Sequence, residues 1–331
     1  MPAREFLVRV ALATGILACA CDKNPLSPDI RPQPCPSCPP RAFTLVDYPY
    51  DISPNESLVV YGHLATPRLP SGVYVIGLAP GSQPRYLMPY VHPAYFDPWG
   101  LRFSPDGKRL VYVRGGYYDL AVFDLESMQE RRVTFTNGNA QEGDWDPSGR
   151  YFVYDRPDLS YGAPDTSAGI FIVDTETLSD RPLLHDGRPT YGGHARWSPD
   201  STRIAFWYGS PSHLYSVRVD GTEYRDLMPS SRNSADSQEW TRADERVFYE
   251  SYGQTSFNVH ETRVIDPVSA QSSRWASDLR LFVNPISRDG SHYVYTYPDA
   301  AGYGVICIQE TRDATGATRR QITSEGQSSI P

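Results

Sequence analysis

The side chains with the clearest chemical potential are charged residues at a repeated position. Each lies one residue before an aromatic or aliphatic residue that leads into a turn, and the signs alternate: Asp51, Arg102, Asp144, Arg196 and Glu239, with Pro285 sixth. If these positions converge, opposite charges become neighbours. We predict a ring of ion pairs that fixes packing, where partly screened pairs contribute about 0–1 kcal/mol each. The alternative is a polar funnel that binds a charged peptide end or a small anion.

Catalytic and metal-binding motifs give no comparable signal. The serine segment at 250–253 lacks the first glycine of a Gly-x-Ser-x-Gly elbow, and His260-Glu261 is not followed by a second histidine at the spacing of a zinc site. The seven histidines are scattered. We therefore predict no catalytic residues, no metal and no cofactor. Ligands gathered from several separate segments stay open as an alternative.

The five cysteines fall into three groups. Cys35 and Cys38 have a Cys-x-x-Cys spacing, but zinc needs four ligands and this segment offers two. A local disulfide between them is the better prediction in an oxidising compartment. Cys307 lies in an apolar run and is expected to be an inert core residue.

The N-terminal residues 1–18 are typical of an export signal, with Arg4 and Arg9 flanking a short apolar segment. The four residues that end at Cys19 resemble the bacterial lipoprotein box, which implies acylation of Cys19, with Cys21 as an alternative site. The other interpretation is a plain secretory signal with an incidental cysteine. The resemblance implies a lipid-anchored protein of the bacterial cell envelope, at the outer membrane, facing the periplasm or the cell surface.

Residues 19–40 contain seven prolines, a density that favours an extended spacer of about 3.1 Å per residue. The net charge of −8 argues against a nucleic acid as partner, because such binders usually carry a basic face. We therefore expect a membrane tether, a stiff arm and a folded body from residue 41 onward.

That body is a series of six related units. The best copies of their turn are Phe103-Ser104-Pro105-Asp106 and Trp197-Ser198-Pro199-Asp200, in which Pro presets φ and Asp can cap the turn. The copies begin at Ile52, Phe103, Trp145, Trp197, Trp240 and Ile286, about 42 to 52 residues apart, the period of a four-stranded propeller blade. The predicted blades lie near 48–90, 100–136, 143–186, 194–229, 237–276 and 282–323.

Each unit continues with a strand after the turn, a third strand that often ends in Asp, and a fourth entered by Arg. No segment has sustained helical periodicity. A single four-stranded sheet cannot bury both of its faces, whereas six around an axis cover one another. The predicted fold is all-β: a six-bladed propeller of antiparallel four-stranded blades over 41–331. Residues 43–46 are expected to add a strand to the sixth blade.

These repeats resemble the TolB-type β-propeller repeat, with its aromatic-Ser-Pro-Asp-Gly turn and its Arg-Arg-Leu-Thr segment. The match is close at Trp197–Leu227 and at Phe103–Thr134. The resemblance implies the propeller fold and little about function, because the fold serves many roles. TolB itself carries an α/β domain ahead of its propeller, where this chain has only the proline-rich arm.

We predict the binding surface in the loops between second and third strands and between blades, where the longest loop is 156–168. These loops are rich in tyrosine, which gives a large contact area at low entropic cost: Tyr117, Tyr118, Tyr161, Tyr191, Tyr208, Tyr252, Tyr297 and Tyr303. The expected function is a monomeric, non-catalytic module that binds an envelope protein or peptide. One alternative is a receptor for a carbohydrate or peptidoglycan fragment in the funnel. Another is a propeller lyase or hydrolase.

Overall fold

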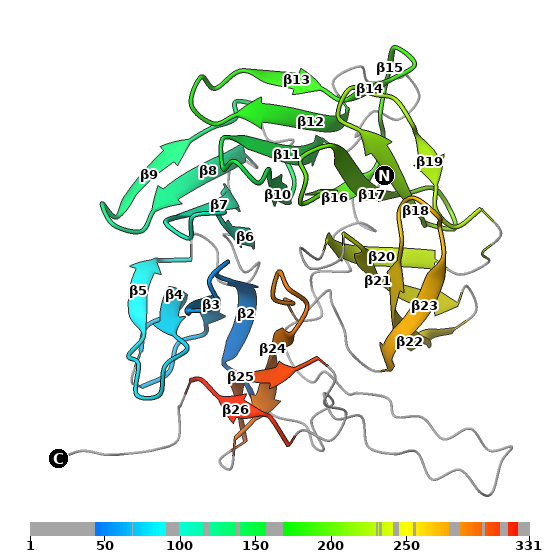
Figure 1. The fold of residues 1–331 in the computed structure, drawn as a ribbon. Coiled ribbons are helices and arrows are strands. Elements are labelled where there is room, and N and C mark those ends of the chain that lie inside the picture. Colours follow the sequence, from blue (N-terminus) through cyan, green and yellow to red (C-terminus); the bar gives the residue numbers. More distant parts are fainter. Residues whose placement is uncertain are drawn as a thin grey trace, which may run out of the picture.

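Six four-stranded sheets stand around a central axis in the computed structural model, and all the strands are short (Figure 1). The structure describes residues 44–67, 69–90, 99–114, 119–136, 140–156, 168–229, 231, 234–240, 245–253, 256–277, 285–299, 302–311 and 317–323. Within these ranges every regular element is a strand. The prediction of a six-bladed, antiparallel, all-β propeller is confirmed.

In blades 1 to 5 the strands follow one another from the axis outward in sequence order, whereas in blade 6 the N-terminal strand lies beside the third strand. Blade 1 consists of β2 (Asp47–Ile52), β3 (Leu58–His63), β4 (Gly72–Gly77) and β5 (Arg85–Met88). Blade 2 consists of β6 (Trp99–Phe103), β7 (Arg109–Arg114), β8 (Asp119–Asp124) and β9 (Gln129–Arg132). Blade 3 consists of β10 (Gly143–Trp145), β11 (Tyr151–Arg156), β12 (Gly169–Asp174) and β13 (Asp180–Pro182).

Blade 4 consists of β16 (Gly193–Trp197), β17 (Arg203–Tyr208), β18 (His213–Arg218) and β19 (Arg225–Asp226). Blade 5 consists of β20 (Ser234–Trp240), β21 (Val247–Gly253), β22 (Ser256–Ile265) and β23 (Ser272–Ser277). Blade 6 consists of β24 (His292–Pro298), β25 (Tyr303–Glu310) and β26 (Arg320–Gln321), together with β1 (Thr44–Leu45). A two-stranded ribbon of β14 (Leu184–His185) and β15 (Arg188–Pro189), which the sequence did not predict, follows blade 3.

The repeated turn joins the first and second strands through a serine–aspartate pair. In blade 4, Ser198 Oγ donates to Asp200 Oδ1 at 2.6 Å and accepts from the Arg203 N–H at 2.8 Å. The degenerate turn of blade 6 has the same arrangement, with Ser287 Oγ donating to Asp289 Oδ1 at 2.6 Å although Arg288 replaces the proline. The hydrogen bonds, rather than the proline, define the turn.

Each interface between consecutive blades holds one hydrophobic cluster, and there are six such clusters among the described residues. The cluster between blades 5 and 6 contains Cys307, a free cysteine whose pKa burial raises to about 12. This placement agrees with an inert core residue.

The arginines that enter the outer strands reach across to the next blade. Arg85 Nη1 donates to the Leu125 carbonyl at 2.9 Å, and Arg131 Nη2 donates to the Thr175 carbonyl at 2.5 Å. Arg320 does the same from blade 6 to the Leu78 carbonyl of blade 1. These contacts link the outer edges of neighbouring blades.

Blade 6 takes its outermost strand from both ends of the folded part. β1 pairs in parallel with the start of β25, within the residues 43–46 that were expected to add a strand here, while β26 pairs antiparallel with Cys307 and Ile308. Thr323 Oγ1 accepts from the Ile306 N–H at 2.8 Å and donates to Asp47 Oδ2 of blade 1 at 2.5 Å. The ring is therefore closed by pairing and by a buried hydrogen bond.

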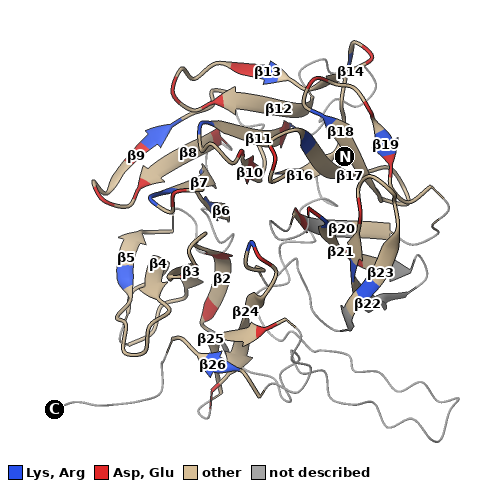
Figure 2. Cartoon of the chain, viewed as in Figure 1, with Lys and Arg blue, Asp and Glu red and all other residues tan. Residues whose placement is uncertain are grey.

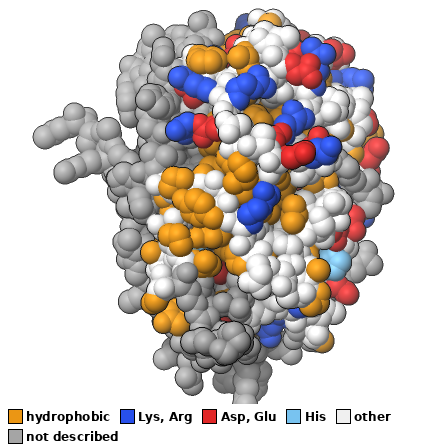
Figure 3. Space-filling view, turned by 90° about the vertical axis from the view of Figure 1, so that its left-hand side faces the viewer, with side chains coloured by type: hydrophobic (Ala, Val, Ile, Leu, Met, Phe, Trp, Pro, Cys, Tyr) orange, Lys and Arg blue, Asp and Glu red, His pale blue; other side chains and the backbone are white. Residues whose placement is uncertain are grey.

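The outer side of the ring around blades 1 and 2 mixes charged side chains with a patch of hydrophobic ones (Figure 3). Tyr86 of β5 and Met128 beside β9 are exposed hydrophobic residues of these blades. Arg85 lies next to Tyr86, and a charged side chain on an edge strand disfavours pairing with another chain.

Residues 1–43 lie outside the described part. The predicted signal peptide (1–18), the acylation sites Cys19 and Cys21, the linker 19–40 and the Cys35–Cys38 disulfide therefore stay predictions. No helix in the described part has the length and hydrophobicity to cross a membrane.

Thr323→Val tests ring closure. We expect it to lower the free energy of unfolding by about 2–3 kcal/mol, because it leaves the buried Asp47 oxygen and the Ile306 N–H without their hydroxyl partner. Urea unfolding measures this loss.

The matched control is Thr134→Val, whose hydroxyl makes the same two kinds of bond within blade 2, to Asp119 and to the Leu120 N–H. Limited proteolysis should release the C-terminal strand early in the Thr323 variant only. Equal release from both variants would contradict a special role of Thr323 in closure.

Candidate functional site

The predicted charged residues come together at the inner ends of the blades. β2, β6, β10, β16 and β20 are the innermost strands and carry Asp51, Arg102, Asp144, Arg196 and Glu239 next to their last residues. Figure 2 shows charged positions, in red and blue, on the innermost strands of the ring. Pro285, the sixth position, is half-buried.

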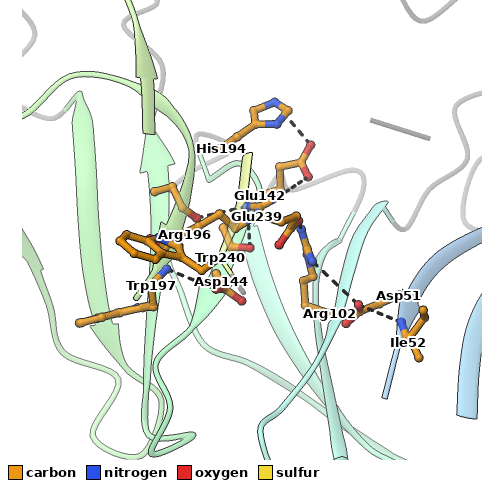
Figure 4. A network of polar contacts seen from close by, with 12 residues as sticks. Asp51, Ile52, Arg102, Glu142, Asp144, His194, Arg196, Trp197, Glu239 and Trp240 are labelled. Carbon is orange, nitrogen blue, oxygen red and sulfur yellow. Dashed lines mark hydrogen bonds and ion pairs between the residues drawn. The ribbon is translucent and has the colours of Figure 1, made fainter. Parts of the chain in front are cut away.

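Glu239 is the centre of the network. Arg196 Nε lies 3.1 Å from Glu239 Oε1, and Arg102 pairs with the same oxygen from blade 2, on the other side of the channel (Figure 4). Burial alone would raise the pKa of Glu239, but the two guanidinium groups outweigh it and lower that pKa. The sequence predicted contacts between neighbouring blades, whereas the Arg102–Glu239 pair crosses the channel.

The two aspartates of the ring also hold the backbone of the next blade. Asp51 Oδ2 accepts from the Phe103 N–H at 2.8 Å, and Asp144 Oδ2 accepts from the Trp197 N–H at 3.3 Å. Burial raises the pKa of Asp51 to about 6, because Arg102, 3.9 Å away, offsets the lost hydration only in part. Burial likewise raises the pKa of Asp144.

A second set of polar groups lies farther along the same channel wall. Glu142 faces the His194 ring at 3.8 Å and Arg196 at 3.9 Å, and these contacts lower the pKa of Glu142 despite burial. Asp155 accepts from the His194 backbone N–H at 3.2 Å, is 4% exposed, and burial raises its pKa to about 7. A carboxyl group with such a pKa can exchange protons near neutrality, but this one is almost fully buried.

The channel narrows to a cavity of about 40 Å³ beside the repeated turns. Its walls include Trp145, Trp197 and Trp240, the turn prolines Pro147 and Pro199, and Arg288. This space suits a few ordered waters, since one water needs roughly 10–15 Å³, whereas ligand pockets span about 300–1,000 Å³. The described cavity is too small for a sugar ring.

Sequence reasoning missed Glu142, His194 and Arg288. Glu142 and His194 lie two residues before Asp144 and Arg196, so the period of two along a strand was the available signal. Arg288 stands at the turn position where the best copies have proline, and this difference was the available signal for it. Asp155 had no signal, because only the packing of blade 3 against blade 4 brings it to His194.

The structure describes the side chains of four of the eight predicted tyrosines. Tyr208 and Tyr303 are 44% and 40% exposed at the ends of β17 and β25, and Tyr191 and Tyr297 are half-buried. Tyr117, Tyr118 and Tyr161 lie outside the described residues, as does most of the loop 156–168, and the side chain of Tyr252 is not described. Phe135, which the sequence analysis did not single out, is 61% exposed just beyond β9.

No group of three or more His, Cys, Asp or Glu side chains could hold a metal ion within the described ranges. The channel charges bind one another and the backbone. The arrangement therefore joins blades through ion pairs and through hydrogen bonds to the backbone, as the predicted ion-pair ring requires.

No protein-family model matches the chain, and no curated protein does. Solved structures share the fold. An oligogalacturonate lyase in complex with manganese is 19% identical, with a TM-score of 0.56 over 86% of this chain and 78% of the other. TolB from Acinetobacter baumannii is 17% identical, with a TM-score of 0.59 over 82% of this chain. This chain spans 65% of that TolB, just under two thirds of its length.

A chain of a nidogen/laminin complex is 11% identical, with a TM-score of 0.53 over 76% of this chain and 89% of the other. The similarity to TolB proteins and the six blades bear out the TolB-type repeat. The protein is a six-bladed β-propeller with a TolB-like fold. At these identities the likeness shows the fold alone.

Glu239→Gln tests the network. We expect a loss of about 3 kcal/mol in the free energy of unfolding, because removing one partner leaves two guanidinium groups without their shared carboxylate in a desolvated channel. Glu223→Gln, which breaks an exposed pair with Arg203, should cost about 0–1 kcal/mol. Equal losses in chemical unfolding would show that the channel charges are solvated.

Asp155→Asn tests the buried carboxyl group. Because the pKa of Asp155 rises from 3.8 to about 7 on folding, its contribution to stability is full below pH 4 and is lost as the pH rises to about 7. The amide oxygen can still accept from the His194 N–H. We expect the variant to be more stable than wild type at pH 8 by about 1–2 kcal/mol and equal to it near pH 4. Parallel pH profiles of unfolding would contradict this assignment.

Proposed function

We propose that this propeller is a non-catalytic module that binds a protein or peptide through its loop face. The loop face is defined as the end of the ring formed by the loops between second and third strands and by the linkers between blades. The Ser-Asp turns lie at the opposite end, because strand direction alternates within each blade.

Exposed aromatic side chains on the loop face are the observation that carries this proposal. Phe135, Tyr208 and Tyr303 belong to blades 2, 4 and 6, and each is at least 40% exposed. Large aromatic side chains are enriched at protein interfaces because they bury much area for little rotamer entropy. Their spacing around the ring suits a partner that covers the disc rather than a ligand that enters it.

The channel favours the same conclusion. Its charged groups are paired with one another, Arg196 is 3% exposed, and the cavity of about 40 Å³ leaves little room for a ligand. A rigid scaffold with variable, exposed loops is the usual arrangement of a recognition module.

The cell envelope is the proposed location. The export signal and the lipoprotein-like sequence before Cys19 support it, with Cys21 as the other acylation site. The proline-rich residues 19–40 would hold the disc away from the membrane, at the outer membrane in this proposal. Mass spectrometry of the mature N-terminus tests acylation, and an unmodified terminus would refute it.

Photocrosslinking in intact cells tests the binding face. A photoreactive phenylalanine analogue at Tyr208 or Tyr303 should give one common adduct, identified by mass spectrometry. The same analogue at Leu178, which is 37% exposed at a turn on the opposite end, is the control. Adducts from position 178 alone would overturn the choice of face.

The matching substitution is Tyr208→Ser with Tyr303→Ser. We expect at least a tenfold loss of affinity for the crosslinked partner, because both aromatic contacts are removed. The melting temperature should stay within about 2 °C, since exposed substitutions rarely change stability by more than 0.5 kcal/mol.

A further inference from the structure

The imidazole ring of His213 joins blade 4 to the linker that leads into blade 5. His213 is the first residue of β18, and its side chain is 14% exposed. Its Nδ1 lies 2.8 Å from Asp226 Oδ2 on β19, and its Nε2 lies 3.2 Å from the Ser231 carbonyl oxygen in the linker. Both distances are those of hydrogen bonds. The ring therefore bridges the outer strand of one blade and the segment between two blades.

Both partners of this ring are acceptors. A carboxylate oxygen and a backbone carbonyl oxygen have no proton to donate, so each ring nitrogen has to supply the hydrogen of its own bond. A neutral imidazole carries one N–H group, whereas the imidazolium carries two. The geometry therefore fits the charged form of His213, in which both contacts are hydrogen bonds.

Other histidines of the described part meet different groups. His292 lies 2.6 Å from the Ser291 hydroxyl and His63 lies 3.4 Å from the Thr66 hydroxyl, and a hydroxyl can either donate or accept. His185 faces a backbone carbonyl at 3.1 Å, but its carboxylate neighbour at 3.5 Å is 87% exposed. These histidines can therefore lose a proton without leaving two acceptors face to face in a partly buried place.

The linker is tied to blade 4 on both sides of Ser231. The Met228 N–H donates to Asp226 Oδ1 at 2.7 Å, and the Ala235 N–H donates to the Ser212 carbonyl at 2.6 Å. Between these two ties, the imidazole holds the Ser231 carbonyl. The histidine contact therefore fixes the middle of the linker against blade 4.

Loss of one ring proton breaks one of the two bonds of His213. The bond from Nδ1 to Asp226 is the shorter one and has a charged acceptor, so the neutral ring keeps its hydrogen on Nδ1. Nε2 then turns a lone pair toward the Ser231 carbonyl oxygen, and the hydrogen bond is lost. The linker is released at this point.

The charged and titratable groups around His213 come from blades 4 and 5. Within blade 4, Tyr208 is its cross-strand neighbour, and burial together with the charge of Asp226 raises the pKa of Tyr215. Arg225, next to Asp226, donates instead to a backbone carbonyl of blade 5. Asp226 is therefore the charge of blade 4 that acts directly on His213.

Blade 5 contributes groups on the other side of the linker. Tyr249 and Arg263 line the same cleft as Ser231. On β20, Glu239 belongs to the channel network, and the side chain of Asp236 is not described. A positive charge on His213 therefore has Asp226 as its counterion.

We propose that His213, Asp226 and Ser231 form a pH-sensitive clamp on the linker between blades 4 and 5. With two ring protons His213 holds both partners, and with one it releases Ser231. Histidine side chains change charge between about pH 5 and 8, so the clamp closes on the acidic side of this range and opens on the alkaline side.

The linker and Tyr208, the cross-strand neighbour of His213, belong to the loop face. Because an ordered surface loses less entropy on binding, the closed clamp favours a partner there. This consequence rests on the proposed function, whereas the clamp itself does not.

Hydrogen–deuterium exchange of the full chain at pH 5.5 and pH 8.5, corrected for the intrinsic pH dependence of exchange, tests the clamp. Protection of peptides covering 227–235 should fall at least fivefold at pH 8.5, because the linker opens once Ser231 is released. Peptides covering 119–134 of blade 2, which contain no histidine, are the internal control and should change less than twofold.

Two substitutions fix the clamp in one state. In His213→Gln the charge is absent, so protection of 227–235 should be low at both pH values. In His213→Arg a cation with several donors is present throughout, so protection should stay high at pH 8.5. The matched control is His185→Gln, which removes another half-buried histidine beside blade 4 and should keep the full pH dependence.

Nitrogen-15 spectra of the histidine rings in the wild-type chain give a second measurement that needs no folded variant. His213 should carry protons on both ring nitrogens at pH 5.5 and on Nδ1 at pH 8.5. A neutral ring with its proton on Nε2, protection of 227–235 that does not change with pH, or an unchanged pH dependence in folded His213→Gln would each overturn the clamp. Failure to crosslink at Tyr208 would refute the binding face and leave the clamp intact.

Discussion

Ring closure is the constraint on which the rest of this structure depends. Each small sheet has two apolar faces, and only its neighbours can cover them, so the six interfaces bury their clusters only if blade 6 meets blade 1. Thr323, bonded to Asp47 and to the Ile306 N–H, and Arg320, bonded to the Leu78 carbonyl, make that junction from the C-terminal side. Strand β1 completes the blade from the N-terminal side.

The inner ends of the blades are held by a different interaction. Burial removes the channel charges from water, and the ion pairs of Arg102 and Arg196 with Glu239 compensate for the lost hydration free energy. These groups are therefore bonded to one another and to the backbone of neighbouring blades. The surface that we propose for recognition is one where the blades differ, at the exposed aromatic residues Phe135, Tyr208 and Tyr303.

Much of the site could be predicted from the sequence because repeats place equivalent residues at equivalent points. The position before each turn identified Arg102 and Arg196 as channel residues, and the outer-strand position identified Arg85 as a recurrent feature. The partners of these residues could not be predicted from the sequence. Arg102 meets Glu239 across the channel, and Arg85 bonds a backbone carbonyl, because both contacts depend on the diameter and twist of the assembled ring.

The sequence by itself determined the strand-turn-strand unit, its six copies and hence the propeller, because a Ser-Asp turn and alternating apolar residues are local properties. Only the tertiary structure decided which charges pair and how the pKa of Asp155 reaches about 7. Asp155 shows the reason. Nothing in its local sequence predicts a raised pKa, which arises only because the assembled blades bury its carboxyl group beside the backbone N–H of His194 in the next blade.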